Sequence, residues 1–352
     1  MTSITVSRGA VRRNLEKLRA MTDARIMAVL KCNGYGMGLV EFARLLKTEG
    51  VRLFAVSRAE EATRLRSAGF DGYLLLLSPV WDRETVLRLA EQRVTLTVAS
   101  LEHASAMSWI FSTADLHPSV HLAVDTGMHR YGFTRDELEK FDPTIQSFAI
   151  EGVFTHFYAA VNDALTEEQH ADFIGCLDTL TARHVDPGIV HCCASMSFLR
   201  HREMHHDMVR LGSALVGTPE GLERVWRFET AAASVKSLKK GSPLGYGGWT
   251  LKRDALVASL PVGFSDGMML KRFEPVGFSG ALRRFAKDVL RPASPIRVFF
   301  RGRELPILGG AGTTHLSVDA TWTDAKPGDI FVIESNPMFL SPDIERKYQE
   351  EL

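Results

Sequence analysis

The sequence has few cysteines, no long apolar run and no excess of charge of either sign. Its 352 residues include 4 cysteines, and none has metal-ligand spacing. The neighbours Cys192 and Cys193 are poorly placed to share an ordinary disulfide. Lys plus Arg and Asp plus Glu both number 42, so no net field favours nucleic acid or an anionic membrane. We therefore expect reduced thiols and a small-molecule partner.

Membrane and export signals are also missing. No window approaches the roughly 20 apolar residues that a membrane span needs, and the first residues, MTSITVSRGAVRRNLEKLRAM, lack the apolar stretch of a secretory signal. The expected location is the cytoplasm. The chain is longer than the roughly 250–300 residues at which a single hydrophobic core stops growing, so two domains are expected.

Short apolar runs alternate with amphipathic segments over the first two thirds of the chain, a pattern typical of strand–helix units around a buried parallel sheet. The runs cover residues 26–30, 53–56, 73–77, 94–98, 120–124, 152–157, 189–192 and 214–217. Eight such units predict a (β/α)8 barrel. A doubly wound sheet is the alternative.

The pattern changes after about residue 225, where strand-like segments are separated by Gly, Pro and Asp turns. We therefore expect an α/β chain with a barrel over residues 1–222 and a mostly-β domain over 223–352. The acidic end, ERKYQEEL, is expected to be a frayed helix. The segment HREMHH (201–206) is expected to be a solvated loop, and no metal site is expected.

Active sites of barrels lie at the carboxyl ends of the strands, and the first run, RIMAVLKCNGYGMG, ends in Lys31 followed by a glycine-rich turn. Partial burial would lower the pKa of this lysine and favour its reaction with an aldehyde cofactor. A lysine alone at a strand end is more often simply solvated.

Motifs around this lysine resemble those of one enzyme family. The segment KCNGYGMG resembles the cofactor-lysine motif K-A-N-A-Y-G-H-G of alanine racemases at five of eight positions. Further resemblances to that family follow in the same order: VDTGMHRYGF (124–133), EGVFTHFYAA (151–160), HCCASMS (191–197), VRLGSALVG (209–217), PLGYGGWT (243–250) and LPVGFSDG (260–267). Their shared order over almost the whole chain is what makes the resemblance specific.

The resemblance implies an enzyme that depends on pyridoxal 5'-phosphate (PLP). Lys31 would hold the cofactor covalently and act as one catalytic base. Tyr35 and Ser195 would bind the phosphate, together with the backbone amides of Gly212 and Ser213. Several convergent donors of this kind suit a phosphate group.

The same resemblance assigns the rest of the site. Arg210 would face the pyridine nitrogen and keep it unprotonated, which favours return of the proton over decarboxylation, and His156 would lie near the ring. Racemisation needs a base on each face of the substrate, and Tyr246 of the other subunit in a homodimer would be the second. Arg130 would bind the substrate carboxylate or orient Tyr246.

Departures from the family pattern gather on the substrate side. Ala123 replaces the usual lysine before the Asp-Thr-Gly motif, so Arg130 needs another partner. The other changed positions are Ala194, Phe264, Thr313 and Thr314, of which the two threonines would line the substrate side. Loss of charge and bulk there would widen the entrance. The hypothesis is a racemase that interconverts L- and D-amino acids, either alanine or a relative such as serine.

Two alternatives remain open at this point. A PLP-dependent decarboxylase can share the architecture, although such enzymes usually place an acidic residue opposite the pyridine nitrogen, where Arg210 is expected here. A non-catalytic PLP-binding homologue is the other alternative, although standalone barrels of that kind lack a β domain.

Overall fold

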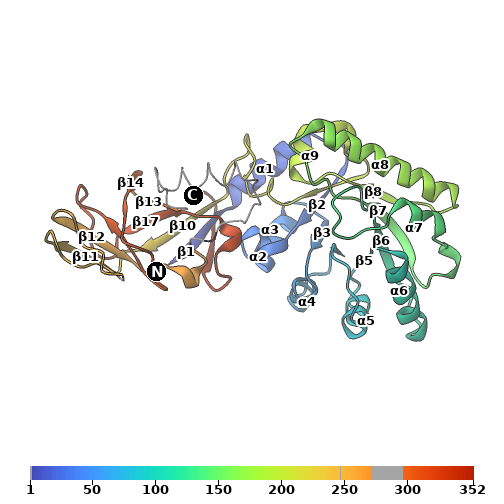
Figure 1. The fold of residues 1–352 in the computed structure, drawn as a ribbon, viewed down its shortest axis with the longest axis horizontal. Coiled ribbons are helices and arrows are strands. Elements are labelled where there is room, and N and C mark those ends of the chain that lie inside the picture. The colour runs from blue at the N-terminus through green and yellow to red at the C-terminus, as the bar shows by residue number, and fades with distance from the viewer. Residues whose placement is uncertain (1, 246, 269, 271–295) are drawn as a thin grey trace. The chain divides into compact units, whose positions relative to one another are not determined.

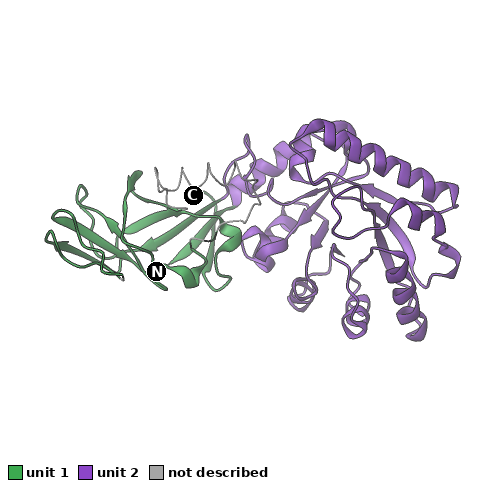
Figure 2. Ribbon diagram, in the orientation of Figure 1, with its two compact units in different colours: residues 1–7, 226–352 green, residues 8–225 purple. Residues whose placement is uncertain are grey.

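The computed structural model describes residues 2–245, 247–268, 270 and 296–352. Tyr246, the expected second base, therefore lies outside the described residues. The chain divides into two compact units (Figure 2): residues 8–225 form one, and residues 1–7 together with 226–352 form the other. In the described part of the chain, no helix is both long enough and apolar enough to cross a membrane.

Residues 8–225 contain two four-stranded parallel sheets that close into one barrel. The first has the order β4 (Tyr73–Leu76), β3 (Leu53–Val56), β2 (Arg25–Val29) and β9 (Met208–Leu211). The second has the order β5 (Leu96–Val98), β6 (Ser119–Ala123), β7 (Ala149–Phe154) and β8 (Ile189–His191). Parallel bridges join Leu75 to Thr95 and Ala194 to Arg210 at the two seams. The predicted (β/α)8 barrel is confirmed.

The last barrel strand lies earlier than predicted. We expected residues 214–217, but the strand is β9, which pairs with β2 from Met208 to Leu211. Residues 213–217 form a turn instead, and the amide of the next residue, Thr218, closes it by donating to the carbonyl of Ser213. The turn was mistaken for a strand because its apolar side chains are fully buried.

Helices surround these strands (Figure 1), and the longer ones bury an apolar face against them. In α3 (Leu39–Thr48), for example, the buried side chains include Phe42, Leu45 and Leu46. The other helices are α1 (Arg8–Ala20), α2 (Lys31–Tyr35), α4 (Ala59–Ser67), α5 (Arg83–Glu91), α6 (Leu101–Thr113), α7 (Arg135–Lys140), α8 (Asp163–Ala182) and α9 (Ser195–Arg200).

The β unit contains two sheets. A six-stranded sheet has the order β14 (Arg303–Leu305), β13 (Arg297–Phe300), β17 (Ile330–Glu334), β10 (Trp226–Ala231), β1 (Ser3–Ser7) and β18 (Glu345–Gln349). A four-stranded sheet has the order β11 (Ser234–Leu238), β12 (Ala255–Leu260), β16 (Leu316–Asp319) and β15 (Ile307–Leu308). The predicted mostly-β character is confirmed.

Both ends of the described chain differ from expectation. Residues 1–7 were assigned to the barrel, but β1 pairs with β10 and β18 in the β unit. The expected frayed helix at the acidic end is wrong, because Glu345–Gln349 forms β18. Its side chains alternate between exposed and half-buried, so pairing with β1 outweighs the helical propensity of these residues.

The histidine-rich segment 201–206 is also not the solvated loop that was expected. His201 and His205 are both 5% exposed. The ring of His205 stacks on Phe198, and its Nε2 bonds the carbonyl of that residue. His206 turns toward a different neighbour, His170 in α8. His205 and His206 therefore each have a defined partner, which composition alone did not reveal.

Candidate active site

Lys31 begins a strained turn directly after β2. The next four residues, Cys32 to Tyr35, all have φ between 54° and 65°, the left-handed region that costs roughly 1–2 kcal/mol for each residue other than glycine. The side-chain oxygen of Asn33 accepts a hydrogen bond from the amide of Leu39 and fixes the turn. Lys31 Nζ lies 6.0 Å from the centre of the Tyr35 ring. Strain of this kind is typical of functional sites.

Tyr35 packs directly against Gly212. A Cβ atom at position 212 would lie 2.4 Å from the Tyr35 ring and its hydroxyl, so only glycine fits between the turn after β9 and this ring. Burial raises the pKa of Tyr35 well above its usual range. Its hydroxyl therefore keeps its proton and is available as a hydrogen-bond donor.

Ser195 adds a second hydroxyl beside Gly212. Its Oγ accepts hydrogen bonds from the amides of Gly212 (3.1 Å) and Ala214 (3.2 Å). Because Oγ is the acceptor in both hydrogen bonds, the hydroxyl hydrogen of Ser195 remains available for donation to another group. Ser195 is 5% exposed, and Ser213 lies half-buried in the same turn. The Ser195 hydroxyl, oriented by these two amides, thus lies near the Tyr35 hydroxyl, which packs on the same Gly212, and hydroxyl donors of this kind suit a phosphate group.

Arg210, at the end of β9, is a buried guanidinium with a rigid hydrogen-bond set. It is 3% exposed and donates to the carbonyls of Thr155 (2.6 Å), His191 (3.0 Å) and Cys192 (3.1 Å). It also bonds Nδ1 of His191 at 2.8 Å and Nδ1 of His156 at 3.4 Å. These bonds fix the plane of the guanidinium against the barrel wall.

His156 lies beside Arg210 at the end of β7. Burial, with a smaller contribution from the positive charges of Arg210, Arg130 and Lys31, lowers its pKa to about 3. The imidazole is therefore neutral near pH 7. It can accept or donate a hydrogen bond in the site without adding charge.

A hydrogen-bonded chain runs from Arg210 into the barrel interior. Since the guanidinium can only donate, His191 accepts at Nδ1 and its Nε2–H donates to Nδ1 of His121 at 2.8 Å. The Nε2–H of His121 then donates to the Tyr73 hydroxyl at 2.9 Å, and this hydroxyl donates to Glu151 at 3.1 Å. Every bond points the same way, from a cation to a carboxylate.

The middle of this chain is neutral. Burial lowers the pKa of His121 to about 3 and lowers that of His191 strongly, in both cases with help from Arg210. Burial also raises the pKa of Tyr73. The sequence did not predict a role for these residues, although His121 and His191 stand inside the apolar runs VHLAV and IVHC.

Arg130 pairs with Tyr131, the residue next to it, and not with the lysine that the family usually has at position 123. Its guanidinium donates to the Tyr131 hydroxyl at 3.1 Å and lies 4.6 Å from the centre of that ring. The Tyr131 hydroxyl in turn donates to the carbonyl of Leu77 at 3.0 Å. Ala123, where the family lysine would stand, is 2% exposed. Arg130, Tyr131 and His156 line one small pocket.

The structure thus brings together the expected site residues of the barrel, whereas the remaining ones belong to the β unit. Thr313 and Thr314 are exposed and precede β16. The carbonyl of Thr313 accepts from the amide and the hydroxyl of Ser265, and the Thr314 hydroxyl bonds His315.

A lysine on a strained turn at the mouth of a closed barrel, beside a cluster of phosphate-type donors, is typical of barrel enzymes that hold an anionic cofactor through lysine. Comparison with known families agrees. The model of the alanine racemase N-terminal domain matches residues 6–220, and that of the C-terminal domain matches residues 225–339. The chain belongs to the alanine racemase family.

Individual relatives support this assignment. The alanine racemase of Limosilactobacillus fermentum is 36% identical over 290 residues, 76% of each chain. That of Streptococcus uberis is 30% identical over 355 residues, 94% of this chain and 93% of the relative.

Solved structures share the fold. Alanine racemase from Clostridium difficile 630 gives a TM-score of 0.87 at 23% identity, covering 99% of this chain and 95% of that one. Alanine racemase from Bartonella henselae, with covalently bound pyridoxal phosphate, gives 0.80 at 22% identity over 99% of both chains.

The buried neutral imidazoles predict acid sensitivity of the barrel. His121 and His156 have a folded pKa of about 3 against an unfolded value of about 6.5, so below pH 6.5 the unfolded chain binds more protons. As the pH is lowered through this window, the free energy of unfolding therefore decreases, by about 1 kcal/mol per imidazole between pH 7 and 5.5. Urea unfolding at several pH values measures the slope.

A pair of variants isolates the effect. His121→Gln should flatten the dependence of unfolding free energy on pH, whatever it does to stability at pH 7. The exposed His117 provides the control, since His117→Gln should leave the slope unchanged. Identical slopes for wild type and His121→Gln would contradict the assignment of a neutral imidazole.

Proposed function

We propose that the protein is a PLP-dependent amino-acid racemase that interconverts the L and D forms of alanine or a related amino acid such as serine. The observation that supports this best is the meeting of Lys31, Tyr35, Ser195 and Gly212 at one end of the barrel, beside the buried Arg210. Pyridoxal phosphate, when bound, supplies an aldehyde that an amine can hold and a ring that withdraws electrons from the substrate Cα.

The barrel residues fit this cofactor. Lys31 would hold it covalently, while the hydroxyls of Tyr35 and Ser195 would donate to the phosphate. The amide of Ser213 would complete that cradle, and the amide of Gly212 would join it by leaving Ser195 Oγ, to which it donates in this structure. The contact between Gly212 and Tyr35 leaves no room for a side chain there. The neutral His156 would lie against the ring without altering its charge.

Arg210 supports racemisation rather than decarboxylation. A guanidinium opposite the pyridine nitrogen disfavours a second positive charge at that nitrogen. Its five hydrogen bonds to carbonyls and imidazoles prevent it from turning away. With electron withdrawal limited in this way, returning a proton to the substrate Cα is favoured over releasing carbon dioxide.

The two proton transfers need two bases. Lys31 would take or return a proton on one face of the substrate Cα, and the phenol of Tyr246 would act on the other. Because Tyr246 belongs to the segment after the barrel, we propose that it acts in the site of a partner subunit within a homodimer.

Arg130 and the two threonines would set the substrate range. Arg130, oriented by Tyr131, is suited to bind the substrate carboxylate. Thr313 and Thr314 would offer small polar groups on the substrate side, where the family has larger ones. A site with less bulk should accept side chains longer than a methyl group.

The covalent link is the first test. Borohydride treatment of the PLP-loaded protein should bleach its visible absorbance and fix the cofactor to the peptide that contains Lys31, as mass spectrometry will show. Lys31→Ala should lose both the label and at least about 10²-fold of racemase activity. Lys47, which is half-buried in α3 and pairs with Asp71, gives the control, and Lys47→Ala should keep both. A label on any other lysine refutes the assignment.

Replacement of the second base should affect the two faces of the substrate differently. In Tyr246→Phe, racemisation should fall by about 10²–10⁴-fold, while exchange of the Cα hydrogen with deuterium oxide should persist for one enantiomer only. Nuclear magnetic resonance measures this exchange. Tyr158→Phe, at an exposed tyrosine of the barrel, should change neither rate. Equal loss of exchange from both enantiomers would argue against a two-base mechanism.

Substrate breadth is tested by comparing kcat/KM for alanine, serine and lysine as substrates. We expect serine to lie within about tenfold of alanine, since a hydroxymethyl group adds little bulk to a wide entrance. Strict preference for alanine would reject the broadened range and leave the racemase assignment intact.

A further inference from the structure

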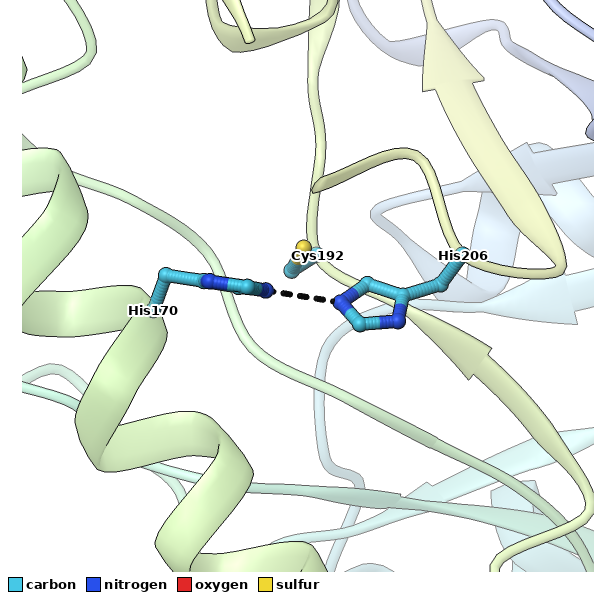
Figure 3. Close-up of side chains that lie close together, drawn as sticks. All are labelled: His170, Cys192 and His206. Atoms are coloured by element: carbon cyan, nitrogen blue, oxygen red, sulfur yellow. Dashed lines mark hydrogen bonds between the residues drawn. The ribbon is translucent and has the colours of Figure 1, made fainter. Parts of the chain in front are cut away.

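Three potential metal ligands from separate segments of the barrel unit lie close together (Figure 3). His170 comes from α8, Cys192 follows β8, and His206 precedes β9. The Nε2 atoms of the two histidines are 2.8 Å apart and hydrogen-bonded. These two nitrogens and the Cys192 sulfur all lie within 4.8 Å of one another. This convergence lies outside the residues assigned to the active site.

The surroundings hold the three groups in place. The Cys192 side chain is fully buried, and its thiol donates to the carbonyl of Met204 at 3.1 Å. Phe157 meets His170 edge-on, and Phe173 does the same for His206. His206, whose ring bonds His170, has a φ of 48°, a strained backbone value.

The donor chemistry suits a cation of zinc type. Two hydrogen-bonded imidazole nitrogens share one proton, and a metal ion can take the place of that proton. Zinc binds histidine nitrogen at about 2.0–2.1 Å and cysteine sulfur at about 2.3 Å, which places ligand atoms roughly 3–4 Å apart. The three atoms therefore need only small rotations.

We propose that His170, Cys192 and His206 form a binding site for Zn²⁺, with the fourth position open to water. Binding displaces the thiol proton of Cys192, so one proton leaves for each ion bound, while the proton between the two rings moves to Nδ1 of the same imidazole. This site does not depend on the proposed racemase activity.

The test is zinc titration of the PLP-loaded protein after removal of metals with a chelator and dialysis. Competition with a chromophoric zinc indicator should reveal one tight equivalent per chain. His170→Gln, Cys192→Ser and His206→Asn should each weaken binding at least about tenfold. Asparagine is chosen at position 206 because it tolerates the left-handed backbone.

Two control variants separate this site from adventitious binding. Cys193 is a buried neighbour whose thiol bonds the same Met204 carbonyl, and Cys193→Ser should keep the affinity. His117→Gln, at an exposed histidine, should keep it as well. Circular dichroism and visible absorbance will show that each variant is folded and loaded.

Cobalt gives an independent readout. Added Co²⁺ should produce a thiolate-to-metal charge-transfer band in the difference spectrum of wild type, and this band should be absent from Cys192→Ser. The proposal is overturned if wild type shows no such band, or if the three ligand variants bind zinc as tightly as wild type does.

Discussion

The rest of the site depends on the hydrogen bonds made by the buried guanidinium of Arg210. A charge in a barrel interior is costly unless its hydrogen bonds are satisfied. Arg210 meets this condition with carbonyls from the ends of β7 and β8 and with two imidazoles. The ends of three strands, β7, β8 and β9, are therefore held together at the place where the cofactor would lie.

The hydrogen-bonded chain that leads from Arg210 to Glu151 explains how polar side chains are tolerated inside an apolar barrel. His191 and His121 are both fully buried, yet each accepts at one nitrogen and donates at the other. Glu151 ends the path with a negative charge. A single missing member would leave a buried donor or acceptor without a partner, which costs about 1–3 kcal/mol.

Local patterns predicted most of the barrel but not its internal contacts. The apolar runs located seven of the eight strands, because most residues of these strands are buried whichever way they point. The eighth was misplaced, since β9 carries Arg210 and reads as less apolar than the buried turn that follows it. The resemblance supplied the proposed cofactor residues, but the partners of Arg210 depend on contacts between residues far apart in sequence, which no local pattern contains.

The placement of β1 has a consequence for how the chain assembles during synthesis. Ser3 pairs with Glu229, and Val6 pairs with Trp226, so this strand leaves the ribosome long before its neighbour exists. At about 5–20 residues per second, the first strand waits roughly 10–45 seconds while the whole barrel emerges. The leading strand must stay unpaired during that time, and the six-stranded sheet can close around it only after the barrel has been made.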